Sequence, residues 1–266
     1  RKKLGIKLKN KRFLLMDCDG VVWKGNQAIK GAQSILRKLE QSGFKLGFVT
    51  NNSSLSRQGF KRKFEDLGFT PENFTIINSS YGAAIYLAER SYTRVFMIGE
   101  QGLREELELQ GIYVTQKYEK NLQGVCIGWD RQLTWHKLAD AMKVILKDNG
   151  FFVGTNPDNS FPLENGLVPG TGAGIAALSN ACGKDPDIII GKPNRFLIDI
   201  TLKEMKCIDS KEAIYIGDRL STDISAGLNA GIDTVLVKTG ISDYHMKNIL
   251  PTVEIDSIVD IFSILN

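Results

Sequence analysis

Two carboxylates stand one residue apart directly after an apolar run near the start of the chain. The string FLLMDCDGVVW places Asp17 and Asp19 on either side of Cys18, with Gly20 behind them. Such a pair can hold a divalent cation and divide the work of catalysis, one group acting as an ionised nucleophile and the other as acid and base. The alternative is a turn that uses Asp and Gly only for its backbone geometry.

A hydroxyl and two amides follow a second apolar run, in the string KLGFVTNNSS. Thr50, Asn51 and Asn52 precede a predicted helix, where a hydroxyl and the backbone N–H groups of a helix start form a site for phosphate. Because Ser and Asn are also favoured at the start of a helix, simple capping is the competing interpretation.

Two further apolar runs end in charged residues. IIIGKPN carries Lys192 to the end of a predicted strand, where its ammonium would neutralise a phosphoryl oxygen. AIYIGDRLSTDISAG places Asp218 and Asp223 across a strand-to-helix turn. Each aspartate alone suits a helix start, but two of them after a buried strand favour a chemical role.

Other motifs in the sequence support no competing chemistry. Gly170, Gly172 and Gly174 in PGTGAG have GxGxG spacing after a predicted loop, whereas a dinucleotide fingerprint has GxGxxG after a strand. No GxxxxGK[ST] string is present, which excludes a P-loop at the level of the motif. His136 and His245 are the only histidines and give a Ser-His-Asp triad or a multi-histidine metal site little to use.

The elements that must position these residues follow from the alternation of short apolar runs with amphipathic stretches. This pattern predicts an α/β fold of βα units around a mostly parallel sheet. We expect strands at residues 13–16, 45–49, 95–98, 112–114, 125–127, 151–153, 187–190, 213–216 and 234–237. We expect helices at 55–67, 81–89, 103–109, 135–146, 196–205 and 221–230, another that contains 35–39 and another that ends at 181. Since carboxyl ends of parallel strands line one crevice, the Asp pair and Lys192 are expected there.

The chain length points to more than one compact part. At 266 residues it exceeds the common range of about 100–200 residues per domain. No repeat and no low-complexity linker is present, so an insertion must be joined through short hinges. We expect a core formed by residues 1–91 and 184–266, and an inserted, smaller α/β domain at 92–183.

Composition excludes several classes of protein. Lys and Arg outnumber Asp and Glu by 34 to 30, which is too small an excess for a nucleic-acid binder. No apolar run approaches the about 20 residues that cross a bilayer, and the basic start RKKLGIKLKNKR lacks the apolar segment of a secretory signal. Four cysteines without CxxC spacing favour a reducing compartment, and we expect a cytoplasmic protein.

In chain order, DxDG, a strand-end Thr, Lys and GDxxxxD resemble the motifs of the haloacid dehalogenase superfamily of phosphohydrolases. The strings DCDGVVWKG, LGFVTNNSS, GTNPDNSFPLENGLVPGTG, GKPNRF and GDRLSTDISAG run from Asp17 to Gly227. They are similar to the branch that contains 4-nitrophenylphosphatase, phosphoglycolate phosphatase and pyridoxal phosphate phosphatase. The resemblance implies a Rossmann-like core with an α/β cap inserted between the Thr and Lys motifs.

The resemblance also implies a role for each acidic residue. Asp17 would be the nucleophile that forms an aspartyl-phosphate, and Asp19 would protonate the leaving oxygen and then activate water. Mg²⁺ would be held by Asp17, the backbone carbonyl of Asp19 and Asp218, while Asp223 would orient these ligands. We expect the pKa of Asp19 to be raised relative to that of Asp17, because Asp19 must be protonated for part of the cycle.

The phosphoryl group would be bound by other residues of the same motifs. The resemblance implies that Thr50 and Lys192 contact its oxygens, with help from the backbone of Asn51 and Asn52. Trp23 would lie in a flap beside the active site.

A cap loop within residues 156–169 would read the rest of the substrate. Its segment PLENG is more similar to phosphoglycolate phosphatases than to pyridoxal phosphate phosphatases. The predicted substrate is a small phosphorylated metabolite, first of all 2-phosphoglycolate, with 4-nitrophenyl phosphate as an artificial substrate and pyridoxal 5'-phosphate as the alternative. Closure of the cap would disfavour phosphoproteins.

Three further possibilities stay open at this point. A pseudoenzyme that only binds phosphorylated ligands would be expected to lack Asp17 or Asp19, and both are present. A homodimer through the cap is compatible with its apolar strands. Cys18 is either a small buried hydrophobic residue or a redox-sensitive thiol.

Overall fold

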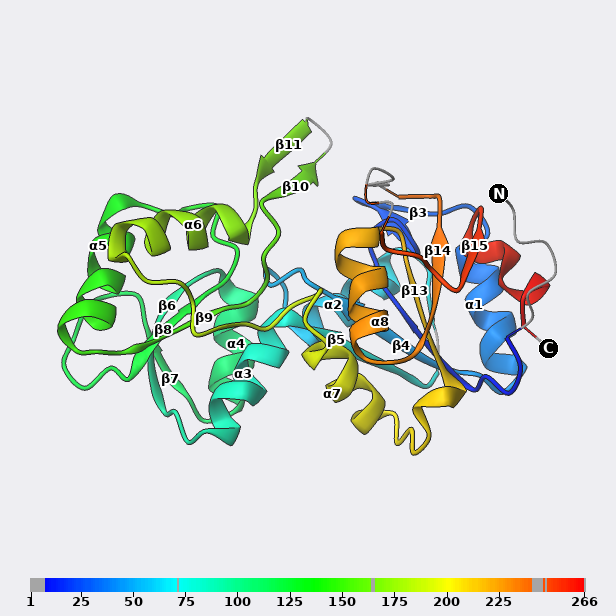
Figure 1. Cartoon of the computed structure of the whole chain (residues 1–266), viewed down its shortest axis with the longest axis horizontal. Coiled ribbons are helices and arrows are strands. Elements are labelled where there is room, and N and C mark those ends of the chain that lie inside the picture. The colour runs from blue at the N-terminus through cyan, green and yellow to red at the C-terminus, as the bar shows by residue number, and fades with distance from the viewer. Residues whose placement is uncertain (1–7, 71, 164–165, 241–245, 247, 266) are drawn as a thin grey trace. The chain divides into compact units, whose positions relative to one another are not determined.

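The computed structural model describes residues 8–70, 72–163, 166–240, 246 and 248–265. Its contacts divide the chain into two compact units (Figure 1). The core unit runs to Thr50 and also contains Lys61–Ile77 and the chain from Lys192 onward. The inserted unit consists of Asn51–Phe60 and Asn78–Gly191. The domain boundaries at residues 92 and 183 stay a prediction.

The core unit is built on a six-stranded sheet. In spatial order it contains β15 (Val253–Ile255), β14 (Asp233–Val237), β13 (Ala213–Gly217), β1 (Phe13–Met16), β4 (Lys45–Thr50) and β5 (Phe74–Asn78). The pairings from β15 to β4 are parallel. All four residues of β1 are buried, so this central strand is covered on both faces.

The strand order of the core sheet creates a switch point beside β1. The chain leaves β1 toward β4 and β5 on one side, and later returns to β13 on the other side. Phe13 pairs with both Lys45 and Ala213. Open α/β sheets bind ligands outside the carboxyl ends of the strands at such a point.

Helices of the core unit follow its strands as the sequence predicts. They are α1 (Ala32–Gln41), α2 (Arg57–Asp66), α7 (Phe196–Glu204) and α8 (Ser225–Asn229), although the first residues of α2 belong to the inserted unit. The π-helix η3 (Leu220–Ile224) precedes α8, and 3-10 helices occur at η2 (Ser210–Glu212) and η4 (Ile258–Ser263). A short hairpin of β2 (Trp23–Lys24) and β3 (Gln27–Ala28) follows the Asp pair.

The inserted unit has its own five-stranded parallel sheet. Its order is β12 (Ile188–Ile189), β9 (Phe151–Gly154), β8 (Gly124–Ile127), β6 (Arg94–Ile98) and β7 (Tyr113–Thr115). Its helices are α3 (Ser79–Glu89), α4 (Gln101–Leu109), α5 (Trp135–Met142), the π-helical continuation η1 (Lys143–Lys147) and α6 (Thr171–Cys182). Apolar side chains of β6, β8, α5 and α6 form one buried cluster. The predicted α/β class, with two parallel sheets, is confirmed.

The segment at residues 156–169 differs from the loop that the sequence predicts. β10 (Ser160–Leu163) and β11 (Gly166–Pro169) form an antiparallel hairpin in which Ser160 pairs with Pro169. Local signals favoured a loop because Pro, Gly and Asn are frequent here, but the two arms satisfy each other's backbone groups. Glu164 and Asn165 of PLENG lie outside the described residues.

Several predictions concern the surface and the ends of the chain. Within the described ranges, no helix is long and apolar enough to span a membrane. The first seven residues of the basic start and His245 lie outside those ranges. The four cysteines are free, and Cys18 and Cys126 are buried.

Candidate active site

Asp17 extends β1 by one residue before the chain leaves the sheet. Its N–H donates to the carbonyl of Ile216 at 2.9 Å, which continues the β1–β13 ladder. The carbonyl of Cys18 then accepts N–H groups from residues 21, 22 and 23. The turn requires Gly20, whose φ is +83° and whose missing Cβ leaves room for the Asp218 carboxylate. The turn suggested by the DxDG string is therefore present, and it places Asp17 at the switch point.

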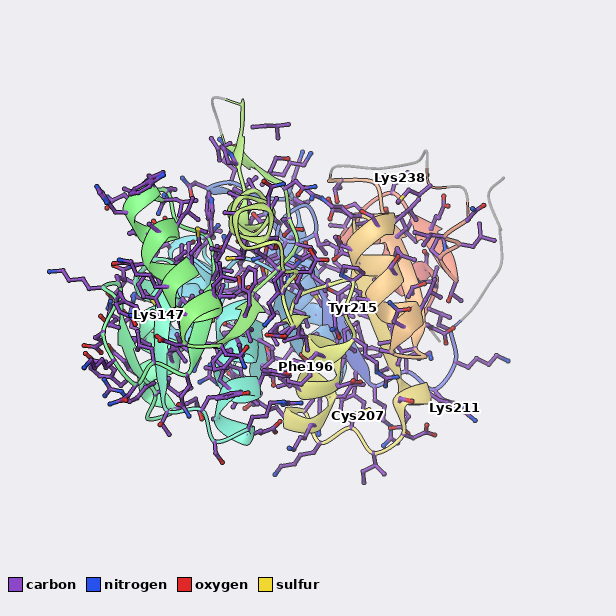
Figure 2. All side chains as sticks on the ribbon, turned by 60° about the vertical axis from the view of Figure 1, so that its left-hand side comes forward. Lys147, Phe196, Cys207, Lys211, Tyr215 and Lys238 are labelled. Carbon is purple, nitrogen blue, oxygen red and sulfur yellow. The ribbon has the colours of Figure 1, made fainter. Side chains whose placement is uncertain are left out.

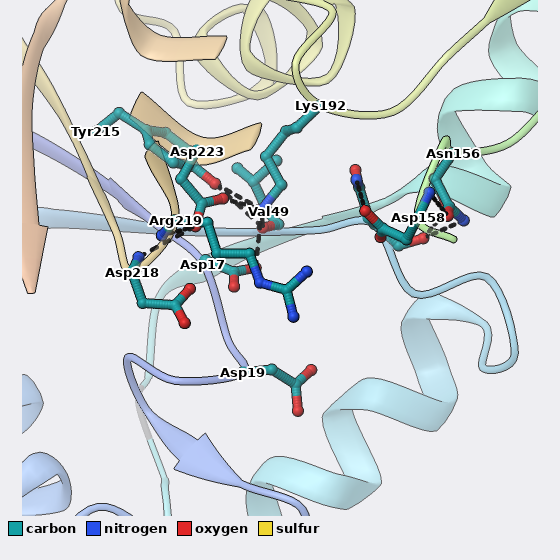
Figure 3. Close-up of polar contacts among 12 residues, drawn as sticks. Asp17, Asp19, Val49, Asn156, Asp158, Lys192, Tyr215, Asp218, Arg219 and Asp223 are labelled. Carbon is teal, nitrogen blue, oxygen red and sulfur yellow. Dashed lines mark hydrogen bonds and ion pairs between the residues drawn. The ribbon is translucent and has the colours of Figure 1, made fainter. Parts of the chain in front are cut away.

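Lys192 lies in the middle of the site, with its ammonium surrounded by oxygen atoms (Figure 3). Nζ donates to Oδ1 of Asp17 at 2.8 Å and to Oδ1 of Asp223 at 2.7 Å. It also lies 2.9 Å from the hydroxyl of Tyr215 and 3.1 Å from the carbonyl of Val49. Lys192 follows β12 in the chain, but its ammonium is held by Val49 of β4 and Tyr215 of β13.

Asp223 is fixed by the start of the helical segment after β13. Its Oδ2 accepts the backbone N–H groups of Asp218 at 3.1 Å and of Arg219 at 3.2 Å. Its Oδ1 accepts from Lys192, so the carboxylate joins the backbone of the turn to the ammonium. One carboxylate therefore makes both the backbone contacts of the turn and the ion pair with Lys192.

Three buried carboxylates come together beside the ammonium. One oxygen from each of Asp17, Asp218 and Asp223 lies within 4.8 Å of the other two. Asp218 is enclosed by glycines, since a Cβ on Gly20 or Gly240 would collide with its carboxylate. Carboxylate oxygens in this number are the ligands of a hard divalent cation, and a cation offsets the cost of gathering like charges in a buried site.

Burial changes the pKa values of the site. Burial raises the pKa of Asp17 to about 7, Lys192 opposes this rise, and the neighbouring carboxylates of Asp223 and Asp19 add to it. Burial also raises the pKa of Asp19, against the lowering effect of Lys63 and of a hydrogen bond from Trp23. Burial thus raises the pKa of both carboxylates, so the rise expected at Asp19 is present but is not confined to it.

The ammonium and the phenol respond to the same surroundings. Burial alone would lower the pKa of Lys192, but Asp17 and Asp223 outweigh it and hold this pKa well above its usual value. Burial raises the pKa of the Tyr215 phenol well above its ordinary value. Lys192 is therefore a cation and Tyr215 a neutral group over the physiological range.

Asp19 is held by Trp23 of the β2–β3 hairpin. Nε1 of Trp23 donates to Oδ1 of Asp19 at 3.1 Å. The indole is fully buried, its ring centroid lies 4.8 Å from that of Phe64, and Nζ of Lys63 lies 4.6 Å above its face. The packed ring thus fixes the direction from which the carboxylate is hydrogen-bonded.

Cys18 lies between the two aspartates with no exposed surface. Burial, together with the charges of Asp17 and Asp19, raises the pKa of its thiol well above the ordinary value. Because oxidation proceeds through the thiolate, this environment favours the interpretation as a buried hydrophobic residue over that as a redox-sensitive thiol.

The TNNSS segment divides between the two units. Thr50 ends β4 in the core unit and is 2% exposed, whereas Asn51 and Asn52 belong to the inserted unit. Oδ1 of Asn52 accepts from the N–H and the hydroxyl of Ser54, so its side chain supports a local turn. Ser56 caps α2 instead, since its hydroxyl accepts the N–H of Gly59 at 3.2 Å.

The inserted unit holds Asn51 by residues that the sequence analysis did not single out. The carbonyl of Asn51 accepts from Oγ of Ser79 at 2.5 Å and from Nδ2 of Asn156 at 2.7 Å. Nδ2 of Asn51 donates to Asp158 at 3.4 Å, and Asp158 is held in turn by Asn156 (Figure 3). The string GTNPDNS was the available signal for Asn156 and Asp158, whereas nothing in the sequence pointed to Ser79 or, within the buried pattern of β13, to Tyr215.

Family comparisons cover both ends of the chain. The family described as "Haloacid dehalogenase-like hydrolase" matches residues 14–113, and the family described as HAD-hydrolase-like matches residues 189–261. Human glycerol-3-phosphate phosphatase is 33% identical, over 95% of this chain and 90% of its own length. Acid sugar phosphatase of Staphylococcus haemolyticus is 34% identical, over 90% of this chain and 89% of its own.

Solved structures are similar over almost the whole chain. A 4-nitrophenylphosphatase from Thermotoga maritima matches with a TM-score of 0.86 and 28% identity, covering 95% of this chain and 96% of its own. A glycerol phosphate phosphatase from Mycobacterium tuberculosis, solved in complex with magnesium, matches with a TM-score of 0.85 and 30% identity. That match covers 96% of this chain and 77% of the other.

Proposed function

The chain belongs to the haloacid dehalogenase-like hydrolases, and from this premise we propose that it is a Mg²⁺-dependent phosphomonoester hydrolase. The observation that carries the proposal is the buried cluster of Asp17, Asp218 and Asp223 around Lys192 at the switch point of the core sheet. A site of this kind gathers cationic and hard-ligand groups around one carboxylate, as transfer of a phosphoryl group requires.

Asp17 is the proposed nucleophile. An oxygen of its carboxylate attacks phosphorus, the new O–P bond forms as the ester bond breaks, and Asp19 gives its proton to the leaving oxygen. Water then attacks the aspartyl-phosphate while Asp19 takes up a proton, which releases inorganic phosphate and restores Asp17. Trp23 supports both steps, because its indole N–H holds the Asp19 carboxyl in one orientation.

Mg²⁺ is the proposed cofactor, and the donor set of the site fits it. Asp17, the backbone carbonyl of Asp19 and Asp218 are the proposed ligands, and Asp223 orients them through its two backbone hydrogen bonds. All of these are oxygen donors, which Mg²⁺ prefers. When bound, the ion neutralises charge between the anionic ester and Asp17, and it lowers the pKa of Asp17 below the value of about 7 that burial sets.

Lys192 and Thr50 are the proposed ligands of the transferring phosphoryl group. Both are almost fully buried, Thr50 at the end of β4 in the core sheet and Lys192 after β12 of the other sheet. The ammonium offers a full positive charge to the equatorial oxygens, where charge accumulates in the transition state. The corresponding role of the Asn51 and Asn52 backbone stays a prediction.

The proposed substrates are small metabolites with a single phosphate ester. 2-Phosphoglycolate is the substrate that the PLENG string favours, and glycerol 3-phosphate is favoured by the names of two relatives. We place both ahead of pyridoxal 5'-phosphate and of sugar phosphates, because both are short esters. A cytoplasmic location and a homodimer through the inserted unit belong to the same proposal.

The test is release of inorganic phosphate with and without Mg²⁺, with 4-nitrophenyl phosphate, 2-phosphoglycolate, glycerol 3-phosphate and pyridoxal 5'-phosphate as substrates. The proposal predicts turnover that requires the metal and is fastest, in kcat/KM, on one of the two short esters. Fastest turnover of pyridoxal 5'-phosphate would keep the chemistry and overturn the substrate class. Binding of phosphate esters without turnover of any of them would establish the alternative, a binding-only protein.

A further inference from the structure

Tyr215 is a polar residue inside an otherwise apolar central strand. β13 reads AIYIG, all five residues are buried, and Tyr215 has no exposed surface. Figure 2 shows Tyr215 within the core unit, whereas Lys211 and Lys238 lie at its surface. An aliphatic residue would fill this position without needing a hydrogen-bond partner, whereas a buried phenol hydroxyl needs one.

The register of the sheet directs Tyr215 to the site. Tyr215 pairs with Leu15, and because side chains alternate along a strand, it lies on the same face as Asp17, two residues further on. The hydroxyl lies 2.9 Å from Nζ of Lys192 and donates to the carbonyl of Val49 at 3.4 Å. The phenol thus contacts both the ammonium and the last residues of β4.

The number of donors on Lys192 is smaller than the number of acceptors around it. An ammonium has three N–H donors, while the oxygens of Asp17, Asp223, Tyr215 and Val49 all lie 2.7–3.1 Å away. The two carboxylates hold their N–H groups by charge, whereas the phenol and the carbonyl are neutral acceptors. A phosphoryl oxygen that binds Lys192 therefore takes an N–H from a neutral acceptor, and the carbonyl of Val49 is the more distant of the two, at 3.1 Å against 2.9 Å.

We propose that Tyr215 is a positioning residue whose hydroxyl holds the Lys192 ammonium beside Asp17, while the carbonyl of Val49 yields the ammonium's N–H to the phosphoryl oxygen of the substrate. This inference rests on the proposed function. The exchange leaves no buried group without a partner, because the carbonyl of Val49 still accepts a hydrogen bond from the hydroxyl of Tyr215. Held in this way, the ammonium needs no reorientation when the ester arrives.

The role predicts an effect that does not depend on the leaving group. Lys192 acts on the non-transferred phosphoryl oxygens, which are present both when the ester bond breaks and when the aspartyl-phosphate is hydrolysed. Loss of the Tyr215 oxygen therefore slows all substrates by the same factor. It also weakens the binding of inorganic phosphate, a competitive inhibitor that presents the same oxygens to Lys192.

The experiment compares Tyr215→Phe with Thr201→Val. Each change removes one buried hydroxyl of the core unit, and the hydroxyl of Thr201 donates to the carbonyl of Leu197 at 2.6 Å. For Tyr215→Phe we expect kcat/KM to fall about tenfold on 4-nitrophenyl phosphate and on the best alkyl ester, as expected for a charge-assisted hydrogen bond. The inhibition constant of inorganic phosphate should rise, and Thr201→Val should keep kcat/KM within about twofold.

Tyr215→Met removes the phenol but keeps an apolar side chain, and it should reproduce the kinetic loss if Tyr215→Phe does not fold. The inference is overturned if either variant turns over both esters at the wild-type rate, or if Thr201→Val shows the same loss. Absence of Mg²⁺-dependent turnover in the wild-type protein overturns the proposed function, and this inference with it.

Discussion

The two parallel sheets of the molecule use their switch points differently. In the core unit, Asp17 follows β1 and Asp218 follows β13, and both are buried near a single ammonium. In the inserted unit, Glu100 and Arg131 follow the neighbouring strands β6 and β8 and pair with each other at 2.7 Å. A crevice of about 400 Å³ lies there, lined by charged side chains that form ion pairs.

The difference shows that a switch point in the strand order is not enough to form a binding site, because the pairing of the charged side chains also matters. At the crevice of the inserted unit, Asp130 has its own cation in Lys137, at 2.6 Å, and the Arg131 side chain is 61% exposed. In the core unit, Asp17 and Asp223 share Lys192, whose side chain is 3% exposed. A cation shared by two buried carboxylates keeps electrostatic energy available for a ligand. Asp130, although its side chain is only 3% exposed, is satisfied by a cation of its own, and the Glu100–Arg131 pair is weakened by water around the exposed Arg131.

The largest effect should follow from removing the shared cation. Lys192→Met should lower kcat by about 10²–10³-fold, because a fixed charge on the phosphoryl oxygens is lost. Lys137→Met, the matched change in the inserted unit, should alter stability but leave kcat within about twofold. Steady-state kinetics on 4-nitrophenyl phosphate measures both values of kcat. An equal fall in kcat for the two variants would contradict a catalytic role that is confined to the switch point of the core unit.

Substitution of one carboxylate should have opposite effects on stability in the two units. Burial raises the pKa of Asp17 to about 7, so its contribution to stability is present at low pH and is lost as pH rises toward and through 7. In EDTA at pH 8, Asp17→Asn should therefore be more stable than wild type by roughly 2–4 kcal/mol, and at pH 4 by little. Asp130→Asn should instead destabilise, because it leaves Lys137 without its partner.

Chemical denaturation at both pH values, followed by circular dichroism, tests this prediction. A gain of stability for Asp17→Asn that does not change between pH 4 and pH 8 would show that the buried charge is not its source.

Two buried tryptophans provide a smaller and more selective test. Nε1 of Trp23 donates to Asp19, and Nε1 of Trp129 donates to the carbonyl of Pro169 at 2.9 Å. Trp23→Phe should slow an alkyl phosphate about tenfold more than 4-nitrophenyl phosphate, because a poor leaving group depends more on the orientation of Asp19. Trp129→Phe should slow both esters equally, and a leaving-group dependence in that variant would contradict the assignment.

The smallest effect should come from the exposed pair of the inserted unit. Burial would raise the pKa of Glu100, but hydrogen bonds and charge from Arg131 outweigh it and lower this pKa. The pair therefore stabilises above the usual pKa of a glutamate and loses its effect as pH falls. Arg131→Gln should cost less than about 1 kcal/mol at pH 7 and almost nothing at pH 3, by thermal unfolding.

The sequence predicts the parts of the site that depend on strand ends. Apolar runs before Asp17 and Asp218 suffice to place both at the carboxyl edge of the core sheet, because parallel strands share that edge. Lys192 instead follows β12, a strand of the inserted unit's sheet, so the shared edge does not account for its position. The alternation of runs also predicts both parallel sheets. These features depend on local burial, which the sequence displays directly.

Other features depend on distant contacts and could not be predicted. The hydroxyl of Tyr215 finds Lys192 only through the pairing of β13 with β1, and a buried strand gives no sign of a polar partner. The start of α2 at Arg57 instead of residue 55, capped by Ser56, depends on a choice among several adjacent capping residues. The hairpin at residues 160–169 forms by pairing that outweighs local turn preference.

The central claim is that Asp17 carries the phosphoryl group, and peptide mapping after a rapid quench tests it most directly. The enzyme is mixed with Mg²⁺ and 4-nitrophenyl phosphate, quenched in acid and reduced with borohydride, which converts an aspartyl-phosphate to homoserine. The account predicts homoserine at position 17, within the tryptic peptide Phe13–Lys24, in the wild type and not in Asp17→Asn. Full turnover in Asp17→Asn, or turnover in the wild type without modification of Asp17, would contradict it.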